Sequence, residues 1–165
     1  CICPQSMFRT SQHTHAGMMI ANDDHQVLRF YDEVLGLQRW FDGERPYAQA
    51  TGSRQIFGLE PGETHWMVDF DDPRSGHSLD ARRSGKLKVV RFSASSRLAD
   101  KLDHSRPGSL GLSLYTWRTS DLEGLWKLVQ AGGATRVTDV LADEFGTRAF
   151  SFVAPDGYSW TLLQD

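Results

Sequence analysis

The sequence has few cysteines, and both lie at its start. Cys1 and Cys3 are the only two in the chain of 165 residues, and they are two positions apart. That spacing is too short for an unstrained disulfide bridge. We therefore expect no disulfide framework and a reducing compartment, the cytoplasm. We interpret residues 1–12 as a polar tail in which both cysteines are of no consequence; a two-ligand metal clip and a lipid-modified Cys1 are the alternatives.

Long apolar runs and an excess of positive charge are also missing. No stretch approaches the roughly 18 apolar residues that a membrane-spanning helix needs, and no signal-peptide pattern opens the chain. The formal net charge is −3, with Lys and Arg spread along the sequence. A basic surface for nucleic acid or for an anionic membrane is therefore not expected.

Motifs of covalent catalysis are absent as well. The sequence contains no G-x-S-x-G, and no cysteine lies within the part expected to fold, so nucleophilic catalysis has no support. No phosphate-cradling glycine loop is present either, because Gly132-Gly133 is typical of a helix stop.

What the sequence does contain is one order of elements written twice. In each half, hydrophobic periodicity predicts a strand, an amphipathic helix and three more strands. In the first half, the strands are expected at 13–21, 37–43, 64–70 and 86–92, with a helix from about 25 to Gly36 and an ambiguous segment at 47–58. In the second half, the strands are expected at 109–117, 134–140, 147–153 and 158–163, with a helix from Asp121 to Gly132.

This pattern predicts an α+β protein in which each half forms one sheet with a helix covering one face. The expected organisation is a tail at 1–12, a first βαβββ module at 13–92, a polar linker at 93–108 and a second βαβββ module at 109–165. Ala154-Pro155-Asp156-Gly157 predicts a tight hairpin turn between the last two strands.

Three stretches resemble the vicinal oxygen chelate superfamily, which includes glyoxalases, bleomycin-resistance proteins and extradiol dioxygenases. HAGMMIANDDHQVLRFYDEVLGL (15–37) is similar to that family's opening strand and helix. IFGLEPGETHWMVDF (56–70) is similar to the connection before its third strand, and FSFVAPDGYSWTLLQ (150–164) to its closing hairpin. The resemblance implies two βαβββ modules that form paired half-barrel sheets around a cleft.

Members that use a metal bind a divalent ion with His, Glu or Gln from the first and fourth strands of each module. Carried over by position, the four places fall at His15, at Lys88, at Ser113 or Leu114, and at Thr161. A stable site needs three or more good donors, and only His15 is one. We therefore predict that the family's metal site is absent and that no cofactor is bound. A displaced site using His13, His15, His65 or Asp69 is an alternative, and ordinary surface histidines are another.

The resemblance also indicates which side chains would line the cleft. Counting alternate residues from His15 predicts a face with a cation, hydroxyls and aromatic rings, suited to an anionic or phenolic molecule. The candidate ligand-binding residues are His15, Trp66, Lys88, Ser113, Tyr115, Trp117, Phe150 and Thr161. For each aromatic residue the alternative is core packing, and for Lys88 it is an exposed lysine with a buried stem.

Three functions follow from this interpretation. The first is a binding protein that holds a small, aromatic or anionic organic ligand without a metal, as a homodimer. The second is a metal-dependent lyase, isomerase or dioxygenase that uses His15 as a ligand or general base. The third is a non-catalytic module of a longer protein.

Overall fold

The computed structural model describes residues 15–20, 25–46, 51–71, 86–93 and 101–165. The chain divides into two compact units. The first unit comprises Cys1–Asp23 and Leu37–Ala99, and the second comprises Asp24–Gly36 and Asp100–Asp165. Within the described residues, no helix is both long enough and apolar enough to span a membrane. The expected tail lies outside the described residues, as do residues 94–100 of the expected linker.

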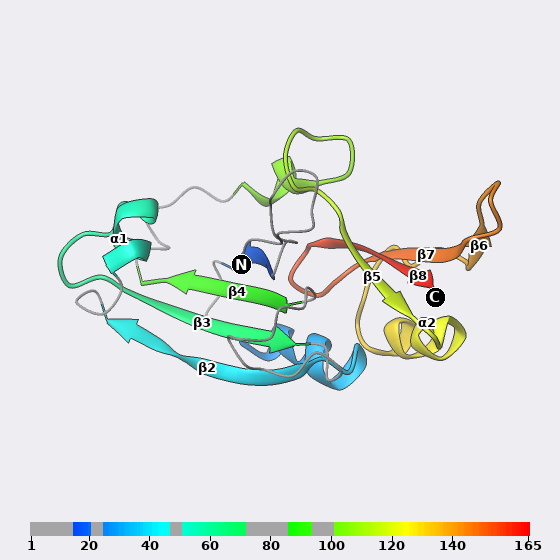
Figure 1. The fold of residues 1–165 in the computed structure, drawn as a ribbon, viewed down its shortest axis with the longest axis horizontal. Helices are drawn as coiled ribbons and strands as arrows, with labels where there is room; N and C mark the ends of the chain where they lie inside the picture. The colour runs from blue at the N-terminus through cyan, green and yellow to red at the C-terminus, as the bar shows by residue number, and fades with distance from the viewer. Residues whose placement is uncertain (1–14, 21–24, 47–50, 72–85, 94–100) are drawn as a thin grey trace, which may run out of the picture. The chain divides into compact units, whose positions relative to one another are not determined.

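The first unit contains a four-stranded sheet, here called the first sheet, with the strand order β1-β4-β3-β2 (Figure 1). β1 pairs in parallel with β4, and the other neighbours are antiparallel. A short helix, α1 (Thr51–Phe57), lies between β2 and β3, where the sequence was ambiguous. The strands are β1 (His15–Met19), β2 (Gln38–Pro46), β3 (Thr64–Asp71) and β4 (Lys86–Phe92). All four expected strands of the first half are confirmed.

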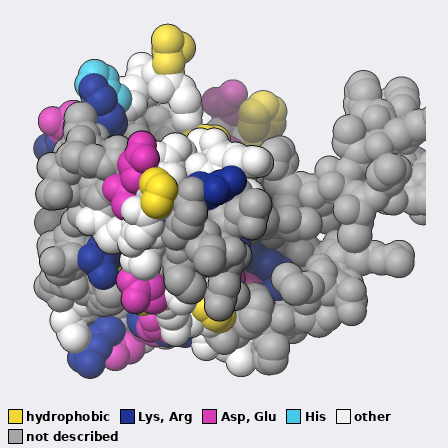
Figure 2. All heavy atoms as spheres, turned by 90° about the vertical axis from the view of Figure 1, so that its left-hand side faces the viewer, with side chains coloured by type: hydrophobic (Ala, Val, Ile, Leu, Met, Phe, Trp, Pro, Cys, Tyr) yellow, Lys and Arg dark blue, Asp and Glu magenta, His cyan; other side chains and the backbone are white. Residues whose placement is uncertain are grey.

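The register of the first sheet separates its side chains into two faces, because paired residues point to the same side. One face is apolar and includes Met18, Val68, Phe70, Leu87 and Val89, all of them buried. The other face brings charged residues of β3 and β4 together. At the end of the unit that carries α1, basic and acidic side chains are interspersed (Figure 2), which agrees with the even spread of charge along the sequence.

The second unit contains a second sheet with the corresponding order β5-β8-β7-β6. Its strands are β5 (Tyr115–Thr119), β6 (Leu141–Ala142), β7 (Arg148–Val153) and β8 (Ser159–Gln164). The α+β class with two sheets is confirmed. β5 begins at Tyr115, later than expected, and residues 109–114 precede it without strand structure. The segment expected as a strand at 134–140 contributes only an isolated bridge from Thr135 to Val153.

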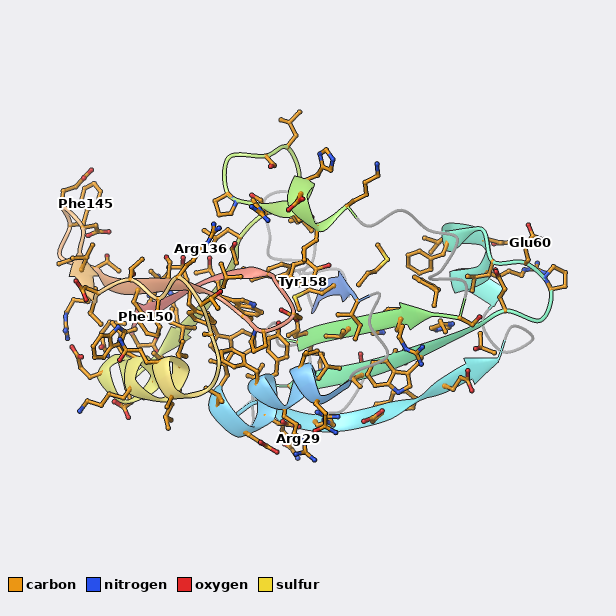
Figure 3. The ribbon with its side chains drawn as sticks, turned by 180° about the vertical axis from the view of Figure 1, so that it is seen from behind. Arg29, Glu60, Arg136, Phe145, Phe150 and Tyr158 are labelled. Atoms are coloured by element: carbon orange, nitrogen blue, oxygen red, sulfur yellow. The ribbon has the colours of Figure 1, made fainter. Side chains whose placement is uncertain are left out.

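α2 (Leu122–Ala131) lies where the sequence predicts a helix. The Asp121 carboxylate accepts a hydrogen bond from the Gly124 amide at 2.9 Å, which caps the first turn. Leu122 and Val129 are buried beneath it. Phe150 lies on the side of the second sheet that α2 covers, whereas Phe145 lies away from the sheet on the β6–β7 hairpin (Figure 3). The helix ends at Gly132, as expected.

The helical segment of the first half packs on the second sheet. It consists of η1, a 3₁₀ helix (His25–Leu28), and η2, a π-helix (Phe30–Val34). The ring of Phe30 lies 5.6 Å from that of Phe152, and the ring of Tyr31 lies 5.7 Å from that of Trp160. We had expected each module's helix to cover its own sheet. Residues 24–36 instead belong to the second unit, because the buried rings of Phe30 and Tyr31 contact aromatic side chains of the second sheet.

A hydrogen bond joins this segment to the closing hairpin. The Tyr31 hydroxyl donates to Asp156 Oδ2 at 2.5 Å, and the Tyr158 amide donates to Asp156 Oδ1 at 3.2 Å. Gly157 completes the turn with φ = 91°, a conformation that favours glycine. Two stretches that carry the family resemblance, F-Y in the helix and P-D-G in the hairpin, are therefore in direct contact.

Burial controls the protonation of this contact. Burial, opposed by the hydrogen bond from Tyr31, raises the pKa of Asp156 to about 6. Burial and the nearby carboxyl raise the pKa of Tyr31 well above its ordinary value, so this phenol remains a hydrogen-bond donor at neutral pH. Burial likewise raises the pKa of Tyr115 to about 12. Tyr115 stacks on Trp160 with ring centroids 5.2 Å apart.

Candidate functional site

The second face of the first sheet carries two carboxylates and two ammonium groups side by side. Asp69 and Asp71 alternate along β3, and Lys86 and Lys88 alternate along β4. The register pairs Asp69 with Lys88 and Asp71 with Lys86, so all four side chains point to the same side. We call these four residues the ionic face.

The pair at one end of the ionic face is tight and buried. Lys86 Nζ donates to Asp71 Oδ2 at 2.9 Å. The side chain of Asp71 is 0% exposed and that of Lys86 is 14% exposed. A buried carboxylate needs such a partner, because the cost of removing it from water must be offset. We therefore interpret the Lys86–Asp71 ion pair as a structural contact of the sheet.

The neighbouring pair is looser and more accessible. Lys88 Nζ lies 3.7 Å from Asp69 Oδ1, which is an ion pair but is longer than a hydrogen bond. One third of the Lys88 side chain is exposed, against 11% of the Asp69 side chain. Lys88 therefore presents an ammonium group to solvent on a face whose carboxylates are largely buried.

Beyond the charged pairs, the same face becomes apolar. Val90, Phe92 and Leu59 form a buried cluster, against which Met67 packs. Met67 pairs with Val90 on β4, and Met19 pairs with Val90 from the other side. Met19 is 56% exposed. The face therefore offers a cation at Lys88 with accessible apolar surface next to it.

The corresponding face of the second sheet is lined by hydroxyl groups. Thr161 pairs with Ser151 on β7 and with Thr116 on β5. The Ser151 and Thr161 hydroxyl oxygens are 2.7 Å apart and hydrogen-bonded. Thr116 is exposed, and the other two are half-buried. These hydroxyl groups can accept and donate hydrogen bonds, but they supply no fixed charge.

The predicted site residues of the first unit occupy different places. Lys88 lies on the ionic face. Trp66 lies on the opposite face, where its indole nitrogen donates to Asp42 Oδ1 at 2.8 Å. His15 is the first residue of β1 and pairs with Lys86; its side chain lies outside the described part. Trp66 lies three residues along β3 from Asp69, the partner of Lys88. Side chains alternate between the two faces of a strand, so Trp66 and Lys88 point to opposite sides of the first sheet.

In the second unit, the register separates Thr161 from the aromatic candidates. Tyr115, Trp117 and Phe150 pair with Trp160 or Leu162 and share their face, which packs on the helices. Thr161 lies on the other face. Ser113 lies before β5, in the stretch without strand structure. Our expected phase for β5 is thus displaced by one residue, because the stacking of Tyr115 on Trp160 turns Tyr115 toward the core.

Asp71 and Lys86 have no site role in the prediction from sequence, and Asp69 appears there only as an alternative metal ligand. The sequence nevertheless contains a pattern that indicates all three residues. D-F-D at the end of one predicted strand and K-L-K at the start of the next are joined by a loop, so an antiparallel pairing sets opposite charges against each other. Such cross-strand pairing identifies the ionic face without knowledge of the fold family.

The donor set does not fit the family's divalent metal ion. At the fourth-strand position, Lys88 offers a cationic ammonium group in place of a carboxylate. Thr161 is engaged with Ser151, and Ser113 and Leu114 are poor ligands. Within the described ranges, no group of three or more His, Cys, Asp or Glu residues is placed to hold a metal ion. We therefore derive no chemical step through a metal.

Comparison with known proteins agrees with the architecture. The family model described as Glyoxalase/Bleomycin resistance protein/Dioxygenase superfamily matches residues 12–162. No curated protein matches the sequence.

Three solved structures illustrate the likeness, all at low identity. A glyoxalase family protein from Bacillus cereus is 15% identical with a TM-score of 0.70, and the alignment covers 93% of each chain. A glyoxylase/bleomycin resistance protein/dioxygenase domain from Frankia sp. EAN1pec is 16% identical with a TM-score of 0.62, covering 93% of this chain and 91% of that one. A glyoxalase family protein from Enterococcus faecalis is 18% identical with a TM-score of 0.58, covering 96% and 99%. The match over residues 12–162 shows that this chain belongs to the glyoxalase/bleomycin resistance protein/dioxygenase superfamily.

Proposed function

We propose that this protein binds a small anionic organic molecule, with an apolar or aromatic body, on the face of the first sheet that carries Lys88, without a metal ion. The family membership provides the architecture but no ligand. The observation that carries the proposal is the charge of Lys88, an accessible ammonium group on the strand where metal-using relatives place an acidic ligand.

An ammonium group at this position can replace one property of a divalent ion and not the others. It attracts and hydrogen-bonds an anionic oxygen, such as that of a carboxylate or a phenolate. It cannot chelate two oxygens in fixed geometry, and it cannot lower the pKa of a bound water as a divalent metal does. Binding and retention are therefore better supported than Lewis-acid catalysis.

The apolar surroundings of Lys88 add to this affinity for an amphiphilic molecule. Met19 and Met67 lie on the same face, on either side of Val90, and methionine side chains adapt to ligands of irregular shape. Covering apolar surface contributes roughly 25 cal/mol per Å² removed from water. A ligand with one charged end and an apolar body can use both parts of the face.

The proposal is tested by thermal unfolding with a panel of aryl carboxylates and phenols, before and after treatment with EDTA. A ligand at one hundred times its Kd stabilises the native state by about 2.7 kcal/mol, so the melting temperature should rise by several degrees. We expect the same rise with and without EDTA.

Elemental analysis of the purified protein is the accompanying measurement. One tightly held divalent ion per chain, together with ligand binding that EDTA abolishes and the ion restores, would contradict the proposal. That result would favour the metal-dependent enzyme that uses His15. No rise in melting temperature with any member of the panel would also contradict it.

A further inference from the structure

We infer that the open space above Gly17, beside the Lys88 ammonium group, is the subsite for the anionic group of the ligand. This inference rests on the proposed function and assigns its charged end to one place on the ionic face. It also restricts the ligand to molecules with a single compact anionic group at one end of an apolar body.

Gly17 leaves a gap on the ionic face. It lies in β1, pairs with Lys88 on β4 and is exposed. Apart from its two chain neighbours, no residue that the structure describes has an atom within 4 Å of a Cβ atom built at Gly17. By contrast, a Cβ atom at Gly43 on β2 would lie 3.2 Å from the Phe41 ring. The space at Gly17 is therefore open, and the residue beside it across the strand pair is the accessible lysine.

The ammonium group of Lys88 has hydrogen-bonding capacity left for a ligand. Its ion pair with Asp69 is 3.7 Å long, beyond hydrogen-bond distance. Among the residues that the structure describes, none accepts a hydrogen bond from it. A lysine ammonium has three N–H donors. An anionic oxygen placed over Gly17 can accept a hydrogen bond from one of these N–H groups. The Asp69 carboxylate still attracts the ammonium group in that arrangement.

The next row of the sheet provides a place for the apolar body. Two residues along β1, Met19 pairs with Val90, which pairs with Met67 on β3. Two residues of a strand span about 7 Å, which is the length of one aromatic ring with its substituent. The ligand class that follows is an aryl carboxylate, sulfonate or phenolate whose ring lies toward Met19.

The test uses two fluorescent probes with similar aromatic bodies. 8-Anilinonaphthalene-1-sulfonate carries one anionic group, and N-phenyl-1-naphthylamine lacks it. We expect the wild-type protein to bind the sulfonate at least ten-fold more tightly than the neutral probe at low salt. Lys88→Gln should remove most of this preference, whereas Lys127→Gln, at an exposed position on α2, should leave it unchanged.

Gly17→Val provides the decisive variant. Valine favours strand conformation, and the added side chain meets no obstacle, so the variant should fold as stably as the wild type. It should nevertheless weaken binding of the sulfonate at least ten-fold, because its methyl groups occupy the subsite. Thr116→Val, at an exposed strand position of the second sheet, is the matched control and should bind like the wild type. Near-UV circular dichroism and the urea midpoint verify that each variant is folded.

Three results would overturn the inference. A folded Gly17→Val variant that binds the sulfonate as tightly as the wild type would show that the subsite lies elsewhere. A preference that survives Lys88→Gln would show that the lysine does not supply the charge. Absence of sulfonate binding to the wild type would also overturn it. The proposed function is decided separately, by the binding of the aryl carboxylates and phenols and by the elemental analysis with EDTA.

Discussion

The two sheets have the same strand order but use their second faces differently. In the first sheet, this face carries two aspartates and two lysines in register. In the second sheet, the corresponding face carries the hydroxyl groups of Thr116, Ser151 and Thr161. A repeated architecture therefore does not imply two equivalent sites. The first sheet sets opposite charges against each other on this face, whereas the second sheet presents hydroxyl groups with the exposed cation Arg118 on its edge strand.

The two units also treat buried carboxyl groups differently. Asp71 in the first unit is paired with the Lys86 ammonium group. Asp156 in the second unit is held by a phenol and a backbone amide, which carry no charge. Neutral donors compensate only in part for the burial of a carboxylate, so the pKa of Asp156 is raised to about 6. This contrast can be measured.

The largest effect is expected from removing the cation of the buried pair. Lys86→Met leaves the Asp71 carboxylate buried without its ammonium partner, which should lower the free energy of unfolding by about 3 kcal/mol. Urea unfolding at pH 7 measures it. The double variant with Asp71→Asn should lose clearly less than the sum of the two single variants. Additive losses would show that the two side chains do not depend on each other.

The next effect concerns the pH dependence of the second unit. The pKa of Asp156 is raised to about 6 from 3.8, so the native state binds the proton more tightly than the unfolded state does. Stability from this group is therefore fully present below about pH 4 and is lost as the pH rises through 6. The shift corresponds to about 3 kcal/mol, and residual screening by solvent reduces the expected loss to about 2 kcal/mol.

Asp156→Asn isolates this contribution. The amide oxygen can still accept the hydrogen bond from Tyr31, but it does not titrate in this range. Urea unfolding of the wild type and the variant between pH 4 and 7.5 gives the difference between the two curves. We expect that difference to change by about 2 kcal/mol over this interval. Parallel curves would show that Asp156 titrates normally in the folded protein.

The smallest effect is expected on the hydroxyl-lined face. Thr161→Val removes the hydrogen bond to Ser151 while keeping the shape of the side chain, and it should cost about 1 kcal/mol. Thr116→Val on the same face should cost almost nothing, because Thr116 is exposed. A loss at Thr161 as large as that of Lys86→Met would contradict the view that the second face of this sheet lacks strong polar interactions.

Local patterns predicted much of the fold. β4 begins and ends at the expected residues, and the helix that ends at Gly132 and the turn at Asp156-Gly157 lie where the sequence placed them. These features depend on short-range properties: alternating apolar residues, a capping aspartate, and glycine where φ is positive. Lys88 lies in the fourth strand, where the sequence places it, and its role in ligand binding stays a prediction.

The phase of β5 and the partner of the first helix were not predictable in the same way. An alternating segment has two possible phases, and the choice at Tyr115 depends on Trp160, which is 45 residues away in sequence. The amphipathic pattern of residues 25–36 shows that the helix has a buried side, but it does not show which sheet covers that side. The contacts of Phe30 and Tyr31 with the second sheet answer that question.

The amino-acid order alone was sufficient for the repeated plan of strands and helices, because that plan follows from residue types at given positions. Folding in three dimensions was needed to set Asp69 beside Lys88, to leave space over Gly17 and to join Tyr31 to Asp156. These arrangements depend on register and on packing between distant segments, and no local pattern specifies either.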